Sequence, residues 1–135
     1  MGARENKQLM QHIFEELSKG NSEPFVASMA DDFRWTVTGT TKWSRTYAGK
    51  QSVLAELFAP LRARMKGRIR TTANRFIAEG DFVVVEARGS NTTNRGVPYN
   101  NNYCFVFRLS DHQLKEVTEY FDTELVTAAL GPADE

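Results

Sequence analysis

The sequence predicts a single α+β domain, in which helices cover one face of a strongly curved β-sheet. Two patterns support this prediction: apolar residues recur every three or four positions early in the chain, and every second position in most of its second half. Helices followed by consecutive long strands are typical of a helical layer packed on one sheet. A length of 135 residues suits one compact core, so we expect residues 1–135 to form one domain.

The first two helices are indicated by their apolar faces and their ends. Leu9, Ile13 and Leu17 recur every four residues and form one face of the first helix. Gly20 should end this helix, because glycine readily adopts the left-handed conformation that a C-terminal cap needs. Ser22 is then a candidate N-cap for a short second helix, which should end near Asp31 and Asp32.

The pattern then changes to period two, which predicts a half-buried strand at residues 33–38 that carries Trp35 and Val37. A polar loop with two large aromatic residues, Trp43 and Tyr47, follows. These aromatic side chains could form a lid over a pocket or pack against a dimer partner. An amphipathic helix at residues 50–65 comes next, and Pro60 inside it predicts a kink or an early end.

The second half of the chain reads as four strands and a short final helix. The expected strands are residues 68–78, 82–90, 99–109 and 114–121, and the helix is residues 124–130. Asp111 and His112 between the last two strands predict a tight two-residue hairpin.

This hairpin sets a register for the last two strands. If the loop has two residues, Leu109 pairs with Leu114, and the same register puts one polar and aromatic cluster on a single face. The members of that cluster are Asn101, Tyr103, Tyr120 and Asp122. A slip of one residue would place Asn100, Asn102 and Cys104 there instead.

Asp122 is the candidate catalytic residue of this cluster. A carboxylate beside aromatic rings on a concave sheet face would be partly desolvated, which raises its pKa and suits it to proton transfer. The amide of Asn101 could orient that carboxylate or bind a substrate carbonyl. The alternative is structural, because Asp122 also stands at the start of the last predicted helix, where an N-cap is expected.

Several motifs together resemble the SnoaL-like and ketosteroid-isomerase-like branch of the NTF2-like superfamily. These motifs are "ADDFRW", "YAGKQSVLAEL", "YNNNY" with a following Phe, and "EVTEYFDT". The resemblance implies a cone-shaped fold, with N-terminal helices packed in a curved mixed, mostly antiparallel sheet around a deep pocket. It also implies a homodimer.

The catalytic pattern of the ketosteroid isomerases is not matched. The positions that resemble the general base and the two oxyanion donors carry Val37, Ile13 and Phe105, so we do not expect ketosteroid isomerisation. Asp122 resembles the acid/base Asp of SnoaL-type polyketide cyclases. The resemblance further implies a pocket for a small apolar or aromatic ligand. Its expected lining is Trp35, Val37, Tyr103, Phe105 and Tyr120, with Asn101 and Asp122 as polar groups, although aromatic residues at this spacing also form ordinary cores.

Composition argues against other classes of function. The formal net charge is zero, so no global field attracts nucleic acid or an anionic membrane. No segment has the roughly 20 apolar residues of a membrane span, and the first residues lack the apolar run of a signal peptide. With a single cysteine, a cytoplasmic location is expected. The sequence contains no spaced metal-ligand cluster and no phosphate-binding glycine loop, so we expect no metal and no cofactor.

Two functions remain open from the sequence. The first is a small-molecule-binding domain with acid/base catalysis through Asp122, of the isomerase, cyclase, dehydratase or hydrolase class. The second is a non-catalytic ligand carrier or an interaction module. Independently of this choice, the outer sheet face with Phe82, Val84 and Val106 needs a cover, which predicts a homodimer.

Overall fold

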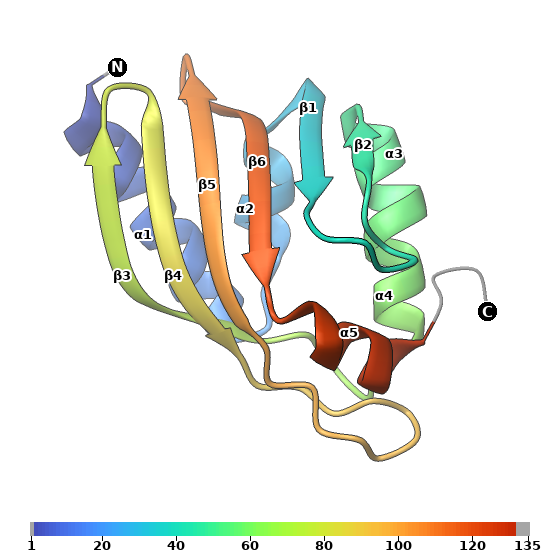
Figure 1. Ribbon diagram of the computed structural model, residues 1–135. Helices are drawn as coiled ribbons and strands as arrows, with labels where there is room; N and C mark the ends of the chain where they lie inside the picture. Colours follow the sequence, from blue (N-terminus) through green and yellow to red (C-terminus); the bar gives the residue numbers. More distant parts are fainter. Residues whose placement is uncertain (1, 132–135) are drawn as a thin grey trace.

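The computed structural model describes residues 2–131 and confirms the α+β architecture (Figure 1). Six strands form one open mixed sheet in the order β2-β1-β6-β5-β4-β3. The strands are β1 (Met29–Val37), β2 (Thr46–Ala48), β3 (Thr71–Glu79), β4 (Phe82–Gly89), β5 (Asn102–Ser110) and β6 (Gln113–Phe121). The helical segments are α1 (Ala3–Ser18), α2 (Glu23–Ser28), α3 (Lys50–Ser52), the π-helix η1 (Val53–Phe58), α4 (Ala59–Ala63) and α5 (Thr123–Leu130).

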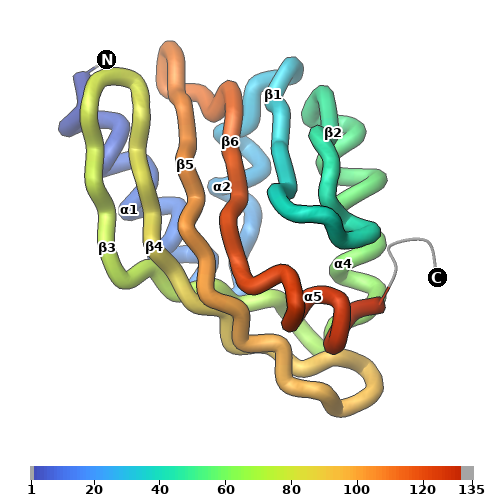
Figure 2. Tube along the Cα trace, in the orientation of Figure 1, coloured from blue at the N-terminus to red at the C-terminus, as the bar shows by residue number. Residues whose placement is uncertain are grey.

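All helical segments except α5 lie on one face of the sheet, and α5 follows the end of β6 (Figure 1). Figure 2 shows α1 and α2 behind the long strands and α4 behind β2, so the concave face is enclosed and the opposite face is open. β1 pairs in parallel with β6, whereas every other neighbouring pair is antiparallel. One parallel contact therefore joins the two-stranded β2-β1 part of the sheet to the four antiparallel strands β6-β5-β4-β3.

The helical predictions are confirmed in outline and corrected at their ends. The buried face of α1 includes Met10, Ile13 and Phe14, and Gly20 follows it with φ 81°. Ser22 occupies the N-cap position of α2 but makes no side-chain capping hydrogen bond. The predicted end of α2 near Asp31 is wrong, because β1 already begins at Met29.

Pro60 changes the winding of the helix that contains it. The turn before the proline, Val53–Phe58, is a π-helix, and the N–H of Ala59 donates to the carbonyl of Leu54, five residues earlier. Proline has no N–H and clashes with the carbonyl four residues before it, and a wider turn relieves that clash. The predicted kink therefore takes the form of a π-helical turn. Leu57, in this turn, is buried in the core.

The two-residue hairpin between β5 and β6 is confirmed. Asp111 and His112 have φ values of 51° and 63°, so both residues are in the left-handed region, as a type I′ turn requires. Ser110 pairs with Gln113 and Leu109 with Leu114, as predicted.

Beyond these two pairs, the predicted register is wrong. The pairing shifts between Arg108 and Leu109, so that Arg108 lies opposite Glu116 and Lys115 is an extra residue in β6. This β-bulge moves all following side chains of β6 to the other face. Phe105 consequently lies opposite Glu119 and not opposite Thr118.

His112 offers a test of the turn. Glycine tolerates the left-handed region without the steric cost that a side chain has there, and Asp-Gly is a favoured type I′ sequence. We expect His112→Gly to raise the free energy of unfolding by about 0.5–1 kcal/mol, measured by urea denaturation. The matched control, Gln113→Gly, lies one residue later in β6 and should destabilise the protein, since glycine weakens a strand. A destabilising His112→Gly would contradict the assigned turn.

Candidate functional site

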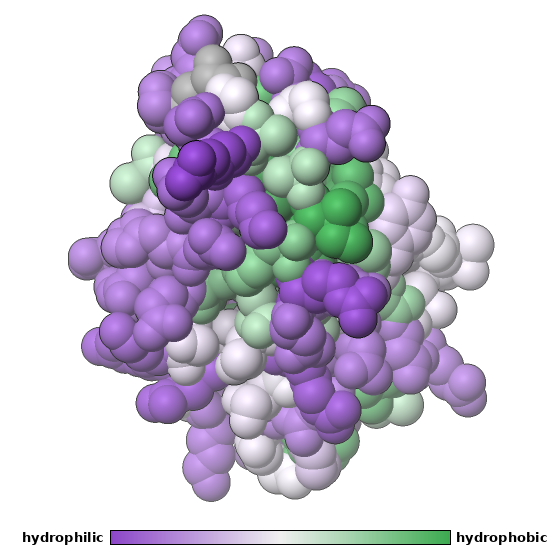
Figure 3. Space-filling view, turned by 90° about the vertical axis from the view of Figure 1, so that its left-hand side faces the viewer, coloured by the Kyte–Doolittle hydropathy of each residue, from purple (hydrophilic) through white to green (hydrophobic). Residues whose placement is uncertain are grey.

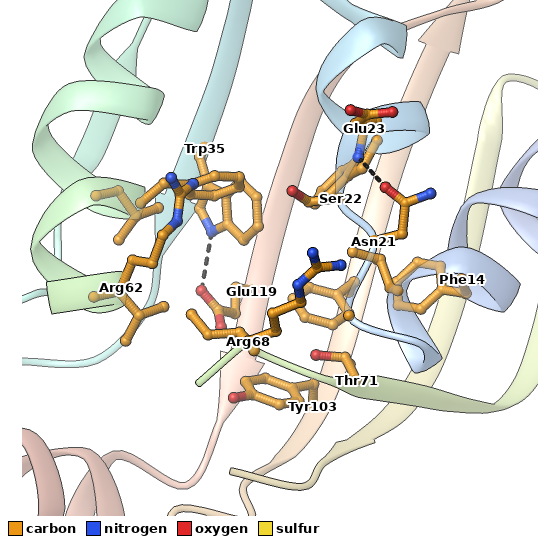
Figure 4. A pocket seen from close by; sticks show the side chains of 18 of the residues that line it. Phe14, Asn21, Ser22, Glu23, Trp35, Arg62, Arg68, Thr71, Tyr103 and Glu119 are labelled. Carbon is orange, nitrogen blue, oxygen red and sulfur yellow. Dashed lines mark hydrogen bonds between the residues drawn. The ribbon is translucent and has the colours of Figure 1, made fainter. Parts of the chain in front are cut away.

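The concave face of the sheet and the helices enclose a cavity of about 430 Å³. The cavity opens between the segment that links α1 to α2 and the segment that links α4 to β3 (Figure 4). Its polar lining residues include Asn21, Ser22, Glu23, Arg62, Arg68, Thr71 and Glu119. Its wide apolar part suits an organic molecule rather than an ion.

Aromatic side chains form most of the cavity wall. Trp35 meets Phe58 edge-on with ring centroids 5.3 Å apart, and Tyr103 stacks on Phe105 at 5.0 Å. The ring centroids of Phe105 and Trp35 are 6.1 Å apart. This contact connects the Trp35–Phe58 pair with the Tyr103–Phe105 pair. Rings that hold one another in these geometries make a wall whose shape is defined before a ligand enters.

Glu119 is the acidic residue of this cavity. It projects from β6 on the concave face and is only 9% exposed. Its Oε1 accepts a hydrogen bond of 2.9 Å from the indole Nε1 of Trp35, as the dashed line in Figure 4 marks. Among residues 2–131 the carboxylate has no other hydrogen-bond partner and no ion pair, and Oε2 is not sealed from the cavity.

This environment raises the pKa of Glu119 to about 7. Burial penalises the charged carboxylate, and the hydrogen bond from Trp35 offsets only part of that penalty. Near neutral pH both protonation states are then populated, so the same side chain can donate or accept a proton. A carboxyl group with these properties is suited to general acid/base chemistry.

Tyr103 supplies a neutral hydroxyl in the same region. Burial holds the pKa of Tyr103 well above its ordinary value, and interactions with Tyr99 and Glu119 raise it further. The hydroxyl therefore stays protonated at any physiological pH. Its ring lines the cavity, and Figure 4 shows it below Glu119.

The structure brings together only part of the predicted pocket. Trp35, Tyr103 and Phe105 line the cavity. Val37 is buried but does not line it. Tyr120 is 51% exposed on the outer face, so the prediction that it faces the pocket is wrong, and the bulge at Lys115 is the physical reason.

Trp43 and Tyr47 belong to the core beside α5. They are 3% and 1% exposed, and the Tyr47 hydroxyl donates to the carbonyl of Trp43 at 2.8 Å. The Trp43 indole donates to the carbonyl of Gly131, also at 2.8 Å. Neither lines the cavity, so the prediction that they form a lid over a pocket or pack against a dimer partner is wrong, and both are core residues.

Asn101 and Asp122 are in contact, but outside the cavity. The Asn101 amide accepts from the N–H of Asp122 and donates to its carbonyl, both at 3.0 Å, and it also donates to the hydroxyl of Tyr99. The Asp122 carboxylate accepts from the N–H of Leu125 at 3.2 Å. The N-cap alternative for Asp122 is therefore confirmed, while a catalytic role for this residue stays a prediction.

Glu119 was missed at the sequence level, although the sequence contains a signal for it. Leu114 and Val117 are both apolar and three positions apart, and strict alternation cannot bury both. One extra residue between them resolves this conflict and also turns Glu119 inward. The residue pattern of β6 thus favoured a bulge over the uninterrupted register.

Comparisons with known proteins agree with this geometry. The family model of the SnoaL-like domain matches residues 10–117, which is most of the chain. The chain belongs to the SnoaL-like family. No curated protein sequence matches it.

Solved structures share the fold of this SnoaL-like domain. An NTF2-like protein from Burkholderia thailandensis E264 is 20% identical, with a TM-score of 0.79 over 93% of this chain and 97% of its own. A protein with a ketosteroid isomerase-like fold from Catenulispora acidiphila DSM 44928, in complex with trimethylamine, is 17% identical, with a TM-score of 0.73 over 94% and 95%. TerC, co-crystallised with polyporic acid, is 20% identical, with a TM-score of 0.76 over 91% and 95%. At these identities the likeness concerns the fold.

Within residues 2–131, no helix is both long enough and apolar enough to cross a membrane.

The raised pKa of Glu119 predicts a specific pH dependence of stability. Between the ordinary glutamate pKa and about 7, the folded protein holds a proton that the unfolded chain has lost, so the free energy of unfolding falls as pH rises. Glu119→Gln removes this effect. We expect the free energy of unfolding of the variant to equal that of the wild type near pH 4 and to be about 3 kcal/mol higher at pH 8. Urea denaturation at a series of pH values measures this difference.

Glu116→Gln is the matched control for this measurement. Glu116 lies on the outer face of the same strand, and the hydrogen bond from Arg108 lowers its pKa. Glu116→Gln should therefore slightly lower the free energy of unfolding at neutral pH, which is the opposite sign to Glu119→Gln. The effect should be small because the Arg108–Glu116 pair is partly exposed. Identical pH profiles of Glu119→Gln and the wild type would contradict the buried, weakly partnered carboxyl group.

Proposed function

We propose that this SnoaL-like protein binds a small apolar or aromatic molecule in the cavity and transfers protons through Glu119, without a cofactor. The observation that carries the proposal is a buried carboxyl group that faces an aromatic cavity and has a single hydrogen-bond partner within the described part of the chain. Reactions of the isomerase, cyclase, dehydratase and hydrolase classes all require such a proton transfer. The pKa of about 7 supports this role, since it lets one residue act as base and then as acid.

The division of work within the site follows from the contacts. Trp35 fixes Oε1 and thereby the plane of the carboxylate, which leaves Oε2 for a substrate proton. The ring of Tyr103, stacked on Phe105, forms part of the cavity wall beside Glu119. The aromatic walls exclude water, which strengthens the polar interactions of Glu119.

The structural neighbours support an organic ligand. One neighbour was co-crystallised with polyporic acid and another binds trimethylamine, so related folds accept small organic molecules. The polyketide cyclase chemistry suggested by the family resemblance is one member of the proposed reaction class. A cytoplasmic location remains part of this proposal.

Kemp elimination of 5-nitrobenzisoxazole tests the base directly, because it requires only a carboxylate in an apolar cavity. The carboxylate removes the proton from the ring carbon, the N–O bond breaks, and a coloured nitrophenolate forms. We expect catalysis by the wild type that rises with pH through about 7, as Glu119 ionises. Glu119→Gln should lower the rate by about 100-fold or more.

Asp122→Asn is the matched control, since Asn also caps helices and the fold should persist. Retained catalysis in Asp122→Asn and its loss in Glu119→Gln would support the proposal. The reverse result would favour Asp122 as the acid/base residue. An inactive wild type would favour the second function, a non-catalytic carrier or interaction module.

We further propose that the outer sheet face forms a homodimer. Ile77, Val84 and Val106 are consecutive cross-strand neighbours on this face, and Ile77 is 53% exposed. Phe82 and Tyr120, also exposed, extend the apolar area. Figure 3 views the side of the molecule that carries α1 and the edge strand β3, and hydrophobic side chains are exposed there among hydrophilic ones. Exposed apolar surface of this kind is typical of an interaction site.

Light scattering at micromolar concentration tests this interface. We expect a mass near twice the 15.3 kDa of one chain for the wild type. Ile77→Asp combined with Tyr120→Asp should give the mass of one chain, because two carboxylates would be buried in the contact. Arg4→Asp, at an exposed position of α1, controls for the change in net charge and should remain dimeric. A monomeric wild type would contradict the dimer and leave the cavity proposal untouched.

A further inference from the structure

Two arginine side chains line the mouth of the cavity. Arg62 comes from α4, and Arg68 from the segment between α4 and β3. Among residues 2–131, neither arginine forms an ion pair or a side-chain hydrogen bond. On the outer sheet face, by contrast, Arg75 and Arg108 each pair with a glutamate on the neighbouring strand. The cations at the cavity are thus left unneutralised where those on the outer sheet face are not.

The aliphatic part of the Arg68 side chain packs on Gly20 at the cavity opening. A Cβ atom at Gly20 would lie only 3.0 Å from the Cβ of Arg68, so the arginine packs against the bare backbone of that glycine. Figure 4 shows its guanidinium extending across the mouth toward Asn21, while the carboxylate of Glu23 lies at the far side of the opening. The charge of Arg68, although the residue is exposed to solvent, therefore stands at the entrance of the cavity.

An adjoining hollow adds positive charge to the same rim. Lys66, Arg68 and Arg70 line it together with glycine, serine, threonine, proline and asparagine residues, and its lining contains no acidic side chain. Arg68 belongs to both hollows. Clustered cations of this kind raise the local concentration of anions and their rate of entry.

Glu119, inside the cavity, does not disfavour an anionic ligand group at the cavity mouth, but it disfavours an anionic group next to itself. The raised pKa keeps Glu119 largely uncharged up to about pH 7, so it does not repel a distant anionic group. A second carboxylate next to Glu119 would be desolvated without a cationic partner, which is costly. Among residues 2–131, the cationic side chains that line the cavity are Arg62 and Arg68, both at its mouth.

We infer that the ligand of this cavity is an aromatic or alicyclic acid, whose ring system lies among Trp35, Phe58 and Phe105 and whose anionic group lies between Arg62 and Arg68. Guanidinium groups bind carboxylates and other planar anions through charge-assisted hydrogen bonds. The reacting carbon or oxygen then lies deeper in the cavity, at Glu119. This inference rests on the proposed function, because it takes the cavity to be the ligand site.

Two probes of nearly the same shape test the inference: anthracene-2-carboxylate and anthracene-2-carboxamide. Their dissociation constants can be measured by calorimetry at pH 6, where the acid probe is ionised and Glu119 is largely protonated. We expect the carboxylate to bind at least tenfold more tightly than the carboxamide, and added salt to weaken only the carboxylate. Arg68→Gln and Arg62→Gln should each weaken the carboxylate about tenfold and leave the carboxamide unchanged.

Two further variants separate charge from fold. Arg68→Lys keeps the charge and should retain most of the preference for the acid. Arg75→Gln removes a cation from the outer face and should change neither dissociation constant.

The outcomes distinguish the inference from the proposed function. Equal binding of the two probes, or an acid preference that survives the Arg62→Gln, Arg68→Gln double variant, overturns the inference while the cavity remains a ligand site. Failure of both probes to bind overturns the inference together with the proposed aromatic-ligand site.

Discussion

The site depends on one extra residue in β6. Lys115 interrupts the pairing with β5, and every later side chain of β6 consequently faces the opposite side of the sheet. Without this bulge, Tyr120 would face the cavity, and Glu119 would lie in solvent with an ordinary pKa. Lys115 also forms an ion pair of 2.9 Å with the exposed Asp32, in the part of β1 where the register with β6 shifts. The irregular parts of these two neighbouring strands are therefore in contact.

The sequence predicted the fold because the fold depends on properties that are local or periodic. The apolar face of α1, the left-handed Gly20 and the two-residue turn at Asp111 and His112 each follow from a few neighbouring residues. The family resemblance supplied the mixed sheet, since a parallel contact between strands as far apart in sequence as β1 and β6 leaves no local pattern.

The site was predicted only in part. In a strand, one error in the register assigns every later side chain to the wrong face of the sheet. Trp35, Tyr103 and Phe105 were placed correctly, since β1 and β5 alternate without interruption where these residues lie. Tyr120 was misplaced and Glu119 overlooked because an uninterrupted register was extended past Lys115. Asp122 lies just beyond β6, where its N-cap role depends on the N–H groups of α5 and not on the sheet.

A purely structural role explains Glu119 poorly. A buried carboxyl group with one hydrogen bond and no cation costs stability above its ordinary pKa, by about 3 kcal/mol once it is fully ionised. A glutamine of the same shape would accept the same hydrogen bond from Trp35 without that cost. The arginines that could neutralise the carboxylate stand at the cavity mouth and make no ion pair with it. What the carboxyl group offers, and the amide does not, is a proton that exchanges near neutral pH. This difference favours the proposed proton transfer over a purely structural role for Glu119.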